Sequence, residues 1–207
     1  MLDFNMNRKE FLKSAGKCCL GSCACVLMGG LMSAHADDST GKPPANAEKP
    51  RSEKRIEFAE NWVTRFMDVL DETLDPETRR KIMMANGKKC YRAWIADTGR
   101  QIKPVTLEQL TEWVNKNVMD DSIRIDRNII YFQFNSAAET GLPSEEGQCL
   151  CTLVETKPKG LSGTYCDCSV GYVKEWHELL LARQVEVELT ESVLRGGKRC
   201  KFKITVL

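Results

Sequence analysis

The sequence predicts one α+β domain, in which N-terminal helices precede an antiparallel sheet with one packed helix before the C-terminal hairpin. Apolar residues recur with the helical period from residue 56 to about residue 118, and the pattern changes to period two from residue 123 onward. Helices first and strands later, with a single helix between strands, are typical of the α+β class. A length of 207 residues suits one ordinary domain.

Three helices are expected in the first half of the domain. The first carries an apolar stripe of Ile56, Ala59, Val63, Phe66 and Leu70. The second begins with an N-cap aspartate followed by proline at the first helical position, Asp75-Pro76. One face of that helix carries Met83, Gly87, Cys90, Tyr91 and Trp94. The third opens with the capping box Thr106–Gln109, has Val105 and Leu110 placed for a hydrophobic staple, and runs to about Val118.

The second half of the domain is predicted to contain several strands and one helix. Residues 123–125 and 129–134 predict a hairpin that turns at residues 126–128. A strand is expected over residues 149–155 and a helix from about Cys166 to Ala182. Two glycines, Gly196-Gly197, separate the last two runs, residues 185–194 and 200–206, and indicate a closing hairpin.

Pairing the closing hairpin tightly across its glycines sets Val193 against Cys200 and Glu191 against Phe202. Glu191 then falls on the buried face, where a carboxylate is costly unless it is paired, coordinated or protonated. The alternative is a bulge that turns Glu191 outward.

Residues 1–36 are predicted to be an export signal rather than part of the fold. A basic start, a modest apolar middle and a small-x-small end at Ala34-His35-Ala36 fit a segment cleaved after Ala36. The run Arg8-Lys9-Glu10-Phe11-Leu12-Lys13 resembles the twin-arginine export motif, with Lys9 in place of the second arginine. Two alternatives are a lipoprotein box ending at Cys23, which would tether the protein to a membrane, and a cytosolic amphipathic N-terminus. Residues 37–50 read as a flexible linker to a single domain over residues 51–207.

Six of the ten cysteines follow the signal: Cys90, Cys149, Cys151, Cys166, Cys168 and Cys200. Cys149 and Cys151 are two apart in the expected strand, so their sulfurs leave the same face. Cys166 and Cys168 can join them only if both precede the helix, because two helical residues are separated by about 200°. The two pairs together predict a metal site of Cys149, Cys151, Cys166 and Cys168, with Cys200 and Glu191 as possible additional ligands.

Four interpretations of the cysteines remain open. Two thiolate pairs suit zinc or an iron–sulfur cluster. Structural disulfides fit an exported protein equally well, although six cysteines allow 15 pairings. A redox-active pair or a nucleophilic thiol is the third interpretation, and inert buried thiols are the fourth. Cys90 is expected to be a buried core thiol, and His177 a partly exposed helix residue rather than a ligand or base.

The last 43 residues carry a recognisable pattern. Its elements are Tyr165-Cys166-Asp167-Cys168-Ser169-Val170-Gly171, Val185-Glu186-Val187-Glu188, Glu191-Ser192, and Gly196-Gly197-x-x-Cys200-x-Phe202-x-Ile204. This ending resembles that of 4-vinyl-reductase-type ligand-binding domains and of the similar 2-aminothiazoline-4-carboxylate hydrolase-like proteins. The resemblance implies an α+β fold with a pocket for small, often aromatic or apolar, ligands. It also implies a zinc site at Cys166, Cys200 and the position of Ser192, where the family has glutamate. Cys168 or Glu191 would have to substitute for that ligand, or the site would be rebuilt around Cys149 and Cys151.

The balance of basic and acidic residues argues against one class of function. The chain has 30 basic and 29 acidic residues, so nucleic-acid binding through a basic face is not expected. A membrane is expected only at the N-terminal signal, because no run of 18 or more apolar residues follows it. The first hypothesis is an exported small-molecule-binding domain beside a cysteine-rich metal site. The alternatives are a hydrolase-like enzyme using a thiolate or metal-bound water, and a disulfide-stapled interaction protein without catalysis.

Overall fold

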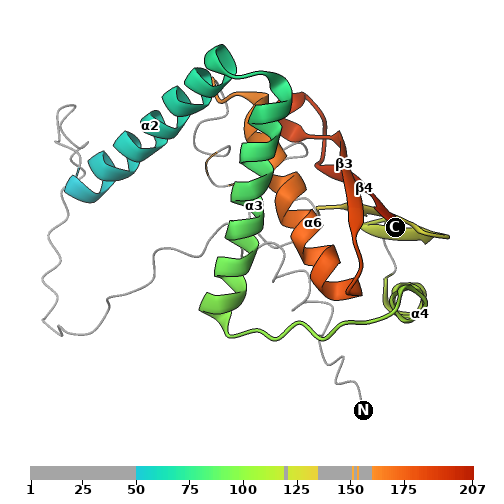
Figure 1. The fold of residues 1–207 in the computed structure, drawn as a ribbon. Helices are drawn as coiled ribbons and strands as arrows, with labels where there is room; N and C mark the ends of the chain where they lie inside the picture. Colours follow the sequence, from blue (N-terminus) through green and yellow to red (C-terminus); the bar gives the residue numbers. More distant parts are fainter. Residues whose placement is uncertain (1–49, 119–120, 135–150, 152, 154–159) are drawn as a thin grey trace, which may run out of the picture.

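The computed structural model describes residues 50–118, 121–134, 151, 153 and 160–207 (Figure 1). The helices are α2 (Arg51–Thr73), α3 (Pro76–Thr98), α4 (Leu107–Asn117) and α6 (Asp167–Leu181), and the strands are β1 (Ile123–Asp126), β2 (Ile129–Gln133), β3 (Val185–Glu191) and β4 (Lys201–Val206). Two 3₁₀ turns, η1 (Gly163–Cys166) and η2 (Val193–Arg195), precede α6 and follow β3. This arrangement confirms the α+β class. None of the helices in these ranges has both the length and the apolar character needed to cross a membrane.

The four strands form one antiparallel sheet in the order β1-β2-β4-β3. The first hairpin is confirmed, because β1 pairs with β2 from Asp126 opposite Ile129 to Ile123 opposite Phe132. Its turn places Arg127 in the left-handed region at φ 55°. α6 lies in the chain between β2 and β3, as the sequence predicts.

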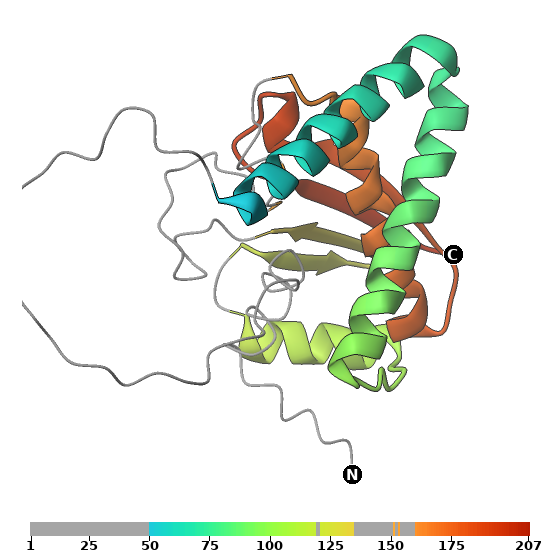
Figure 2. The ribbon, with the colours of Figure 1, turned by 90° about the vertical axis from the view of Figure 1, so that its left-hand side faces the viewer.

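The main core lies between the sheet and the helices α6 and α4 (Figure 2). Val170 and Val173 of α6 are fully buried against Ile130 and Ile204 of the sheet. α4 begins at the predicted capping box, in which the Gln109 amide nitrogen donates to the Thr106 hydroxyl and the Thr106 amide donates to the Gln109 side chain. Its buried residues Leu110 and Val114 close the core beside β1.

α3 lies outside α6, and two glycines let the helix axes approach closely. A Cβ atom on Gly87 would lie 1.8 Å from the backbone oxygen of Cys168, and one on Gly171 would lie 1.9 Å from that of Met84. Tyr91 packs edge-on against Tyr172 farther along the same seam, at 4.9 Å between ring centroids. This contact places the first turn of α6 directly against the middle of α3.

α2 packs on the body through its C-terminal half only. Met67 and Leu70 are buried in a second cluster with Met83 and Leu161, whereas the N-terminal half of α2 projects from the domain (Figures 1 and 2). Of the predicted stripe of Ile56, Ala59, Val63, Phe66 and Leu70, Leu70 is buried and Val63 packs against the second cluster, whereas Ile56 and Phe66 are exposed. The stripe therefore contacts the body only in part, because the N-terminal half of the helix projects from it.

Asp71 ties the end of α2 to the rest of the domain. Its carboxylate accepts hydrogen bonds from the hydroxyls of Ser162 and Thr164 and pairs with Arg79 at 2.7 Å. Burial raises the pKa of this carboxyl, but the two hydroxyl donors and Arg79 outweigh burial and lower the pKa overall. Asp71 therefore stays ionised as the link between α2, α3 and the start of α6.

The strand predicted for residues 149–155 is wrong where the structure describes it. Leu153 is helical, and Cys151 belongs to no strand. Both side chains pack against the second cluster, beneath α2. A short apolar run does not distinguish a strand from a buried helical segment, and here tertiary packing decides.

The closing hairpin is longer and less regular than its two glycines predict. Leu189 faces Phe202, Glu191 faces Lys201, and the register shifts between Leu189 and Glu191. The predicted pairs of Glu191 with Phe202 and of Val193 with Cys200 are therefore wrong. The connection contains η2, which is capped by Ser192, so it uses more residues than a tight turn. The resulting bulge turns Glu191 outward, which was the alternative prediction.

His177 is buried, with 1% of its surface exposed, so the prediction of a partly exposed residue is wrong. Its Nδ1 lies 2.8 Å from the Val173 carbonyl oxygen, which can only accept, so Nδ1 carries the proton. Trp176 and Phe132 pack beside the ring. Burial lowers the pKa of His177 from 6.5 to about 4, and the imidazole is neutral in the folded state.

We expect this histidine to make folding sensitive to acid. Between pH values of about 6.5 and 4 the unfolded chain binds a proton at His177 that the folded chain excludes, so stability falls as the pH falls. The loss between about pH 7 and pH 4 is roughly 3 kcal/mol from this group. Urea unfolding of the wild type and of His177→Leu across this range measures it. Parallel pH profiles for the two proteins would contradict the assignment.

Candidate functional site

Two cysteines meet at the seam between α3 and α6. Cys90 lies one helical turn after Gly87, and Cys168 is the second residue of α6. Because Gly87 lets the backbone of Cys168 approach, the two thiols lie close enough to interact, and each shifts the pKa of the other. Asn86 also donates to Cys168 Sγ, at 3.6 Å. Neither cysteine forms a disulfide here.

The two thiols of this pair differ in exposure and acidity. Cys90 is exposed, which corrects its prediction as a buried core thiol, and Cys168 is half-buried. The hydrogen bond from Cys168 lowers the pKa of Cys90 from 9.0 to about 6. The same bond, together with burial, raises the pKa of Cys168. The positive N-terminal end of α6 adds to the stabilisation of a thiolate beside it. The pKa of Cys90 is thus lowered and that of Cys168 raised, which favours a thiolate at the exposed Cys90 rather than at Cys168.

Cys151 lies behind this pair. Its thiol donates to the Tyr165 hydroxyl at 3.7 Å, and its side chain packs in the same cluster as Cys168. It is close enough that its charge would raise the pKa values of Cys90, Cys166 and Cys168. Cys151 therefore lies near Cys166 as well as near the pair of Cys90 and Cys168.

Cys166 faces the opposite direction from Cys168. It is buried at the end of η1, where the Ser192 hydroxyl donates to its sulfur at 3.4 Å. Burial is the main reason that the pKa of Cys166 is raised, and the nearby Cys200 raises it further. The positions that the family resemblance assigns to zinc, Cys166, Ser192 and Cys200, therefore do gather, but a neutral serine stands where the third ligand is expected.

Glu191 does not supply that missing ligand. Its carboxylate accepts hydrogen bonds from the backbone amides of Lys198 and Arg199 and pairs with the Lys201 ammonium at 2.8 Å. The bond to Lys201 and those two amides lower the pKa of Glu191 to about 2. The carboxylate is thus held in the turn of the closing hairpin by these three contacts.

The structure thus divides the predicted metal-site residues into two groups. Cys168 turns toward Cys90 and Cys166 toward Ser192, while Cys149 lies outside the described residues. Within the described ranges, no three His, Cys, Asp or Glu side chains are arranged to hold a metal ion. A shared site of Cys149, Cys151, Cys166 and Cys168, and with it zinc or an iron–sulfur cluster, stays a prediction.

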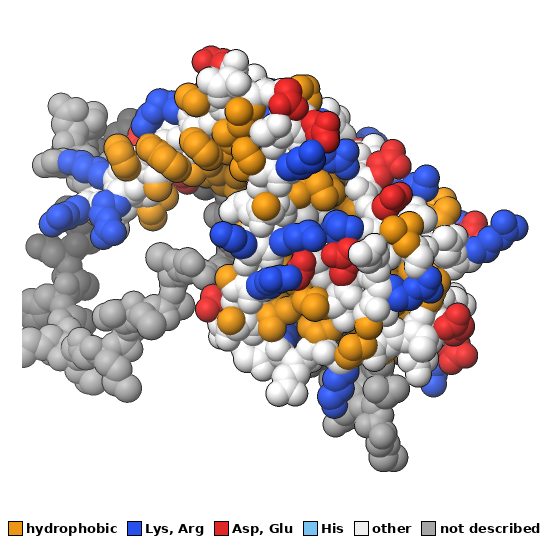
Figure 3. Space-filling model, in the orientation of Figure 1, with side chains coloured by type: hydrophobic (Ala, Val, Ile, Leu, Met, Phe, Trp, Pro, Cys, Tyr) orange, Lys and Arg blue, Asp and Glu red, His pale blue; other side chains and the backbone are white. Residues whose placement is uncertain are grey.

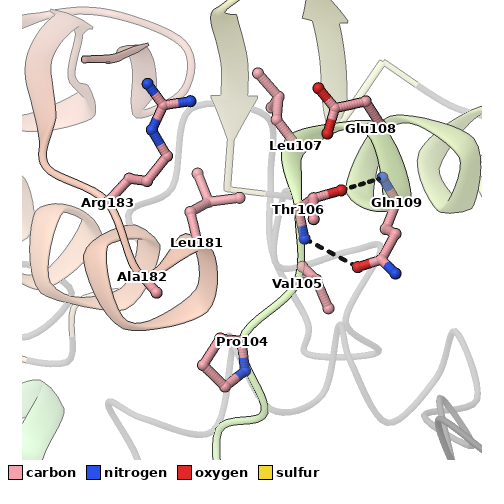
Figure 4. Close-up of a pocket in the computed structure, with 9 residues that line it drawn as sticks. All are labelled: Pro104, Val105, Thr106, Leu107, Glu108, Gln109, Leu181, Ala182 and Arg183. Carbon is pink, nitrogen blue, oxygen red and sulfur yellow. Dashed lines mark hydrogen bonds between the residues drawn. The ribbon is translucent and has the colours of Figure 1, made fainter.

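A groove lies on the other side of the domain, between the start of α4 and the end of α6 (Figure 4). It encloses about 440 Å³ and is lined by Pro104–Gln109 and Leu181–Arg183. Leu107 and Leu181 give it an apolar wall, and Arg183 stands at its edge. This volume lies in the range of small-ligand sites, and the expected small-molecule ligand stays a prediction.

The pairing of Cys90 with Cys168 is the feature of the candidate site that the sequence interpretation missed. Cys90 and Gly87 were placed correctly on one face of α3, but that face was taken as uniformly buried. The available signal was the spacing Gly87-x-x-Cys90 together with Gly171, three residues after Cys168. Glycines within helices mark a close approach of two backbones, and a thiol one turn away lies at the edge of such a contact.

The model of the family described as "Family of unknown function (DUF6144)" matches residues 33–207, and the chain belongs to this family. None of the curated proteins matches the chain.

Two solved structures are similar at low identity. One is trafficking protein particle complex subunit 3 from Naegleria fowleri covalently bound to palmitic acid, 13% identical, with 75% of this chain and 96% of that chain covered and a TM-score of 0.42. The other is a vinyl-4-reductase family protein from Methanocaldococcus jannaschii, 15% identical, with 78% and 84% covered and a TM-score of 0.29. The second belongs to the type of domain that the C-terminal pattern resembles.

Proposed function

We propose that this DUF6144 chain is a thiol–disulfide redox protein, in which Cys90 is the attacking thiol and Cys168 the resolving thiol. The observation that carries the proposal is the placement of the exposed Cys90 beside the half-buried Cys168 at the close contact of α3 and α6, where each thiol shifts the pKa of the other. An exposed thiolate can attack an external disulfide, whereas the protonated Cys168 thiol reacts only in the second step.

The reaction balances with a disulfide as the oxidant. The Cys90 thiolate attacks one sulfur of the external disulfide, forming a mixed disulfide and releasing one thiolate. Cys168 then transfers its proton to the released thiolate or to water and attacks the Cys90 sulfur, which releases the second thiolate and leaves a Cys90–Cys168 disulfide. Two electrons pass from the protein to the external disulfide, and the reverse sequence reduces the protein again.

The predicted export signal is consistent with this chemistry. Disulfides form and persist outside the cytoplasm, and a protein delivered there would meet disulfide-bonded partners. Export of the chain, with cleavage after Ala36 or lipidation at Cys23, is part of the proposal.

Trapping the intermediate tests the order of the two steps. With glutathione disulfide, Cys168→Ser should accumulate one glutathione per chain on Cys90, whereas Cys90→Ser should accumulate none on Cys168. The wild type should lose two thiols together and retain no glutathione. Cys200→Ser, a change away from the pair, should behave as the wild type. Equal labelling of Cys90→Ser and Cys168→Ser would overturn the assignment of roles.

Zinc binding is the second candidate function, because Cys151 lies near Cys90, Cys166 and Cys168. A bound zinc ion would hold these sulfurs as thiolates and prevent their oxidation. Metal analysis of protein purified with its thiols protected separates the candidates. Zinc near one equivalent per chain would favour this second function, and a zinc-free protein that readily forms a disulfide would favour the first.

A further inference from the structure

The exposed face of α2 carries a row of large apolar side chains. Phe58, Trp62, Phe66 and Val69 are 66%, 52%, 41% and 50% exposed. At about 100° per residue these four fall within about 80° of the helix circumference. The rings of Trp62 and Phe66 stack at 5.3 Å. Figure 3 shows this row of hydrophobic side chains along the projecting helix. A contiguous exposed patch of this kind marks a surface that contacts something else.

Basic side chains border the row, whereas most acidic side chains lie on other faces of α2. All four basic residues of the helix are exposed and lie within about 80° of Trp62: Arg51, Lys54, Arg55 and Arg65. Five of its six acidic residues lie about 120° or more from Trp62: Glu53, Glu57, Glu60, Asp68 and Asp71. The sixth, Glu72, lies about 80° away in the last turn. The face that carries the rings is therefore both apolar and positively charged.

We infer that this face of α2 binds the surface of a membrane that contains anionic phospholipid. The helix would lie along the surface, with its rings among the headgroups and its arginines on the lipid phosphates. Tryptophan is enriched at the boundary between membrane and water, and interfacial helices combine tryptophan and phenylalanine with flanking lysine and arginine. This contact would add to the one expected at the N-terminal signal, and it is independent of the redox pair at the seam between α3 and α6.

Area and charge favour a lipid surface over a protein partner. Aromatic side chains bury roughly 150–250 Å² each, so the three half-exposed rings supply on the order of 300 Å². This is well below the roughly 800 Å² per partner of a standard protein interface. A bilayer needs no surface of matching shape, and anionic lipids attract each lysine or arginine held near them. A second copy of the same face would instead be repelled by the basic border.

Tryptophan fluorescence of the full chain tests the inference. Trp62 is exposed, whereas the other three tryptophans, Trp94, Trp113 and Trp176, are partly buried. Vesicles of phosphatidylglycerol with brominated acyl chains should quench the wild type. Trp62→Phe keeps an aromatic ring and should still sediment with these vesicles, within about twofold, but it should lose most of the quenching. Quenching that persists in Trp62→Phe would place the membrane contact elsewhere in the chain and overturn the inference.

A charged side chain in the row tests the apolar part of the contact. Trp62→Asp should weaken binding to phosphatidylglycerol vesicles at least about 30-fold, because it removes the central ring and adds a charge that the lipid repels. Leu207→Asp adds the same charge at a position that is 53% exposed at the other end of the described chain, and it should bind as the wild type does. Circular dichroism should show that both variants fold. Equal binding by Trp62→Asp and the wild type would contradict the inference.

Charge removal tests the electrostatic part. Each basic residue near an anionic surface contributes a factor of about five, so Arg55→Gln combined with Arg65→Gln should weaken binding about 20-fold. Lys103→Gln combined with Lys116→Gln removes the same net charge at exposed positions before and within α4, and it should change binding less than about twofold. Equal losses in the two double variants would show that net charge, rather than this face, attracts the lipid. A wild type that binds phosphatidylglycerol no better than phosphatidylcholine would also overturn the inference.

Discussion

Replacing Gly87 by alanine is expected to destabilise the domain by about 3 kcal/mol, although alanine is the better helix former. Helix propensity alone predicts a gain of about 1 kcal/mol. The added Cβ would lie 1.8 Å from the backbone oxygen of Cys168, and no rotamer change can relieve a clash with backbone. α3 and α6 must separate, and the packing of Tyr91 on Tyr172 is lost with them.

Thermal unfolding measures this effect. For a domain of this size the expected change is a fall in Tm of roughly 6–12 °C. Gly171→Ala should behave in the same way, since its Cβ would meet the backbone of Met84. Ala85→Gly, the reverse change at an exposed position of α3, should cost only about 1 kcal/mol. A Gly87→Ala variant as stable as the wild type would show that the two helices do not approach as closely as described.

The second large effect is expected on the acidity of Cys90. In the wild type the rate of alkylation by iodoacetamide should rise with a midpoint near pH 6, the pKa that the Cys168 hydrogen bond gives to Cys90. Cys168→Ala removes the group that lowers this pKa, so the midpoint should move to the ordinary thiol value of 9.0 or above, because burial and the nearby Cys151 both raise the pKa. Mass spectrometry of the Cys90 peptide as a function of pH measures both midpoints.

Reactivity at neutral pH should change less than the pKa does. The thiolate fraction at Cys90 falls about 100-fold at pH 7 when the pKa rises by three units. A thiolate of higher pKa is the stronger nucleophile, which offsets part of this loss and leaves a decrease of several-fold. Cys200→Ala should leave both the midpoint and the rate unchanged. An unshifted midpoint in Cys168→Ala would show that another group sets the acidity of Cys90.

Most of the fold could be predicted because local signals and tertiary packing agree there. The capping box at Thr106 and the hairpin turn at residues 126–128 are encoded within a few residues. The strand over residues 149–155 was wrong for the opposite reason. In that segment several arrangements satisfy the local pattern, and contacts with Leu161, Met83 and the rest of the second cluster choose among them.

The candidate site was only partly predictable for a similar reason. Sequence spacing pairs Cys166 with Cys168, but η1 ends at Cys166 and α6 begins at Asp167, so the two thiols diverge. The partner of Cys168 comes from 78 positions earlier in the chain, and the contact depends on two glycines in different helices. Neither the spacing of the cysteines nor the periodicity of α3 indicates that these two residues, so far apart in the chain, are in contact. The burial of His177 likewise depends on Phe132 of β2, which lies far from it in sequence.

The central claim is that Cys90 and Cys168 form a reversible disulfide between α3 and α6, and peptide mapping of the oxidised protein tests it most directly. The full chain is equilibrated with glutathione disulfide, its remaining thiols are alkylated, and the disulfide-linked peptides are identified by mass spectrometry before and after reduction. The account predicts one dominant link, between the peptides that contain Cys90 and Cys168, which disappears on reduction. A dominant link between Cys149 and Cys151, or any product in which Cys90 and Cys168 remain thiols, would contradict it.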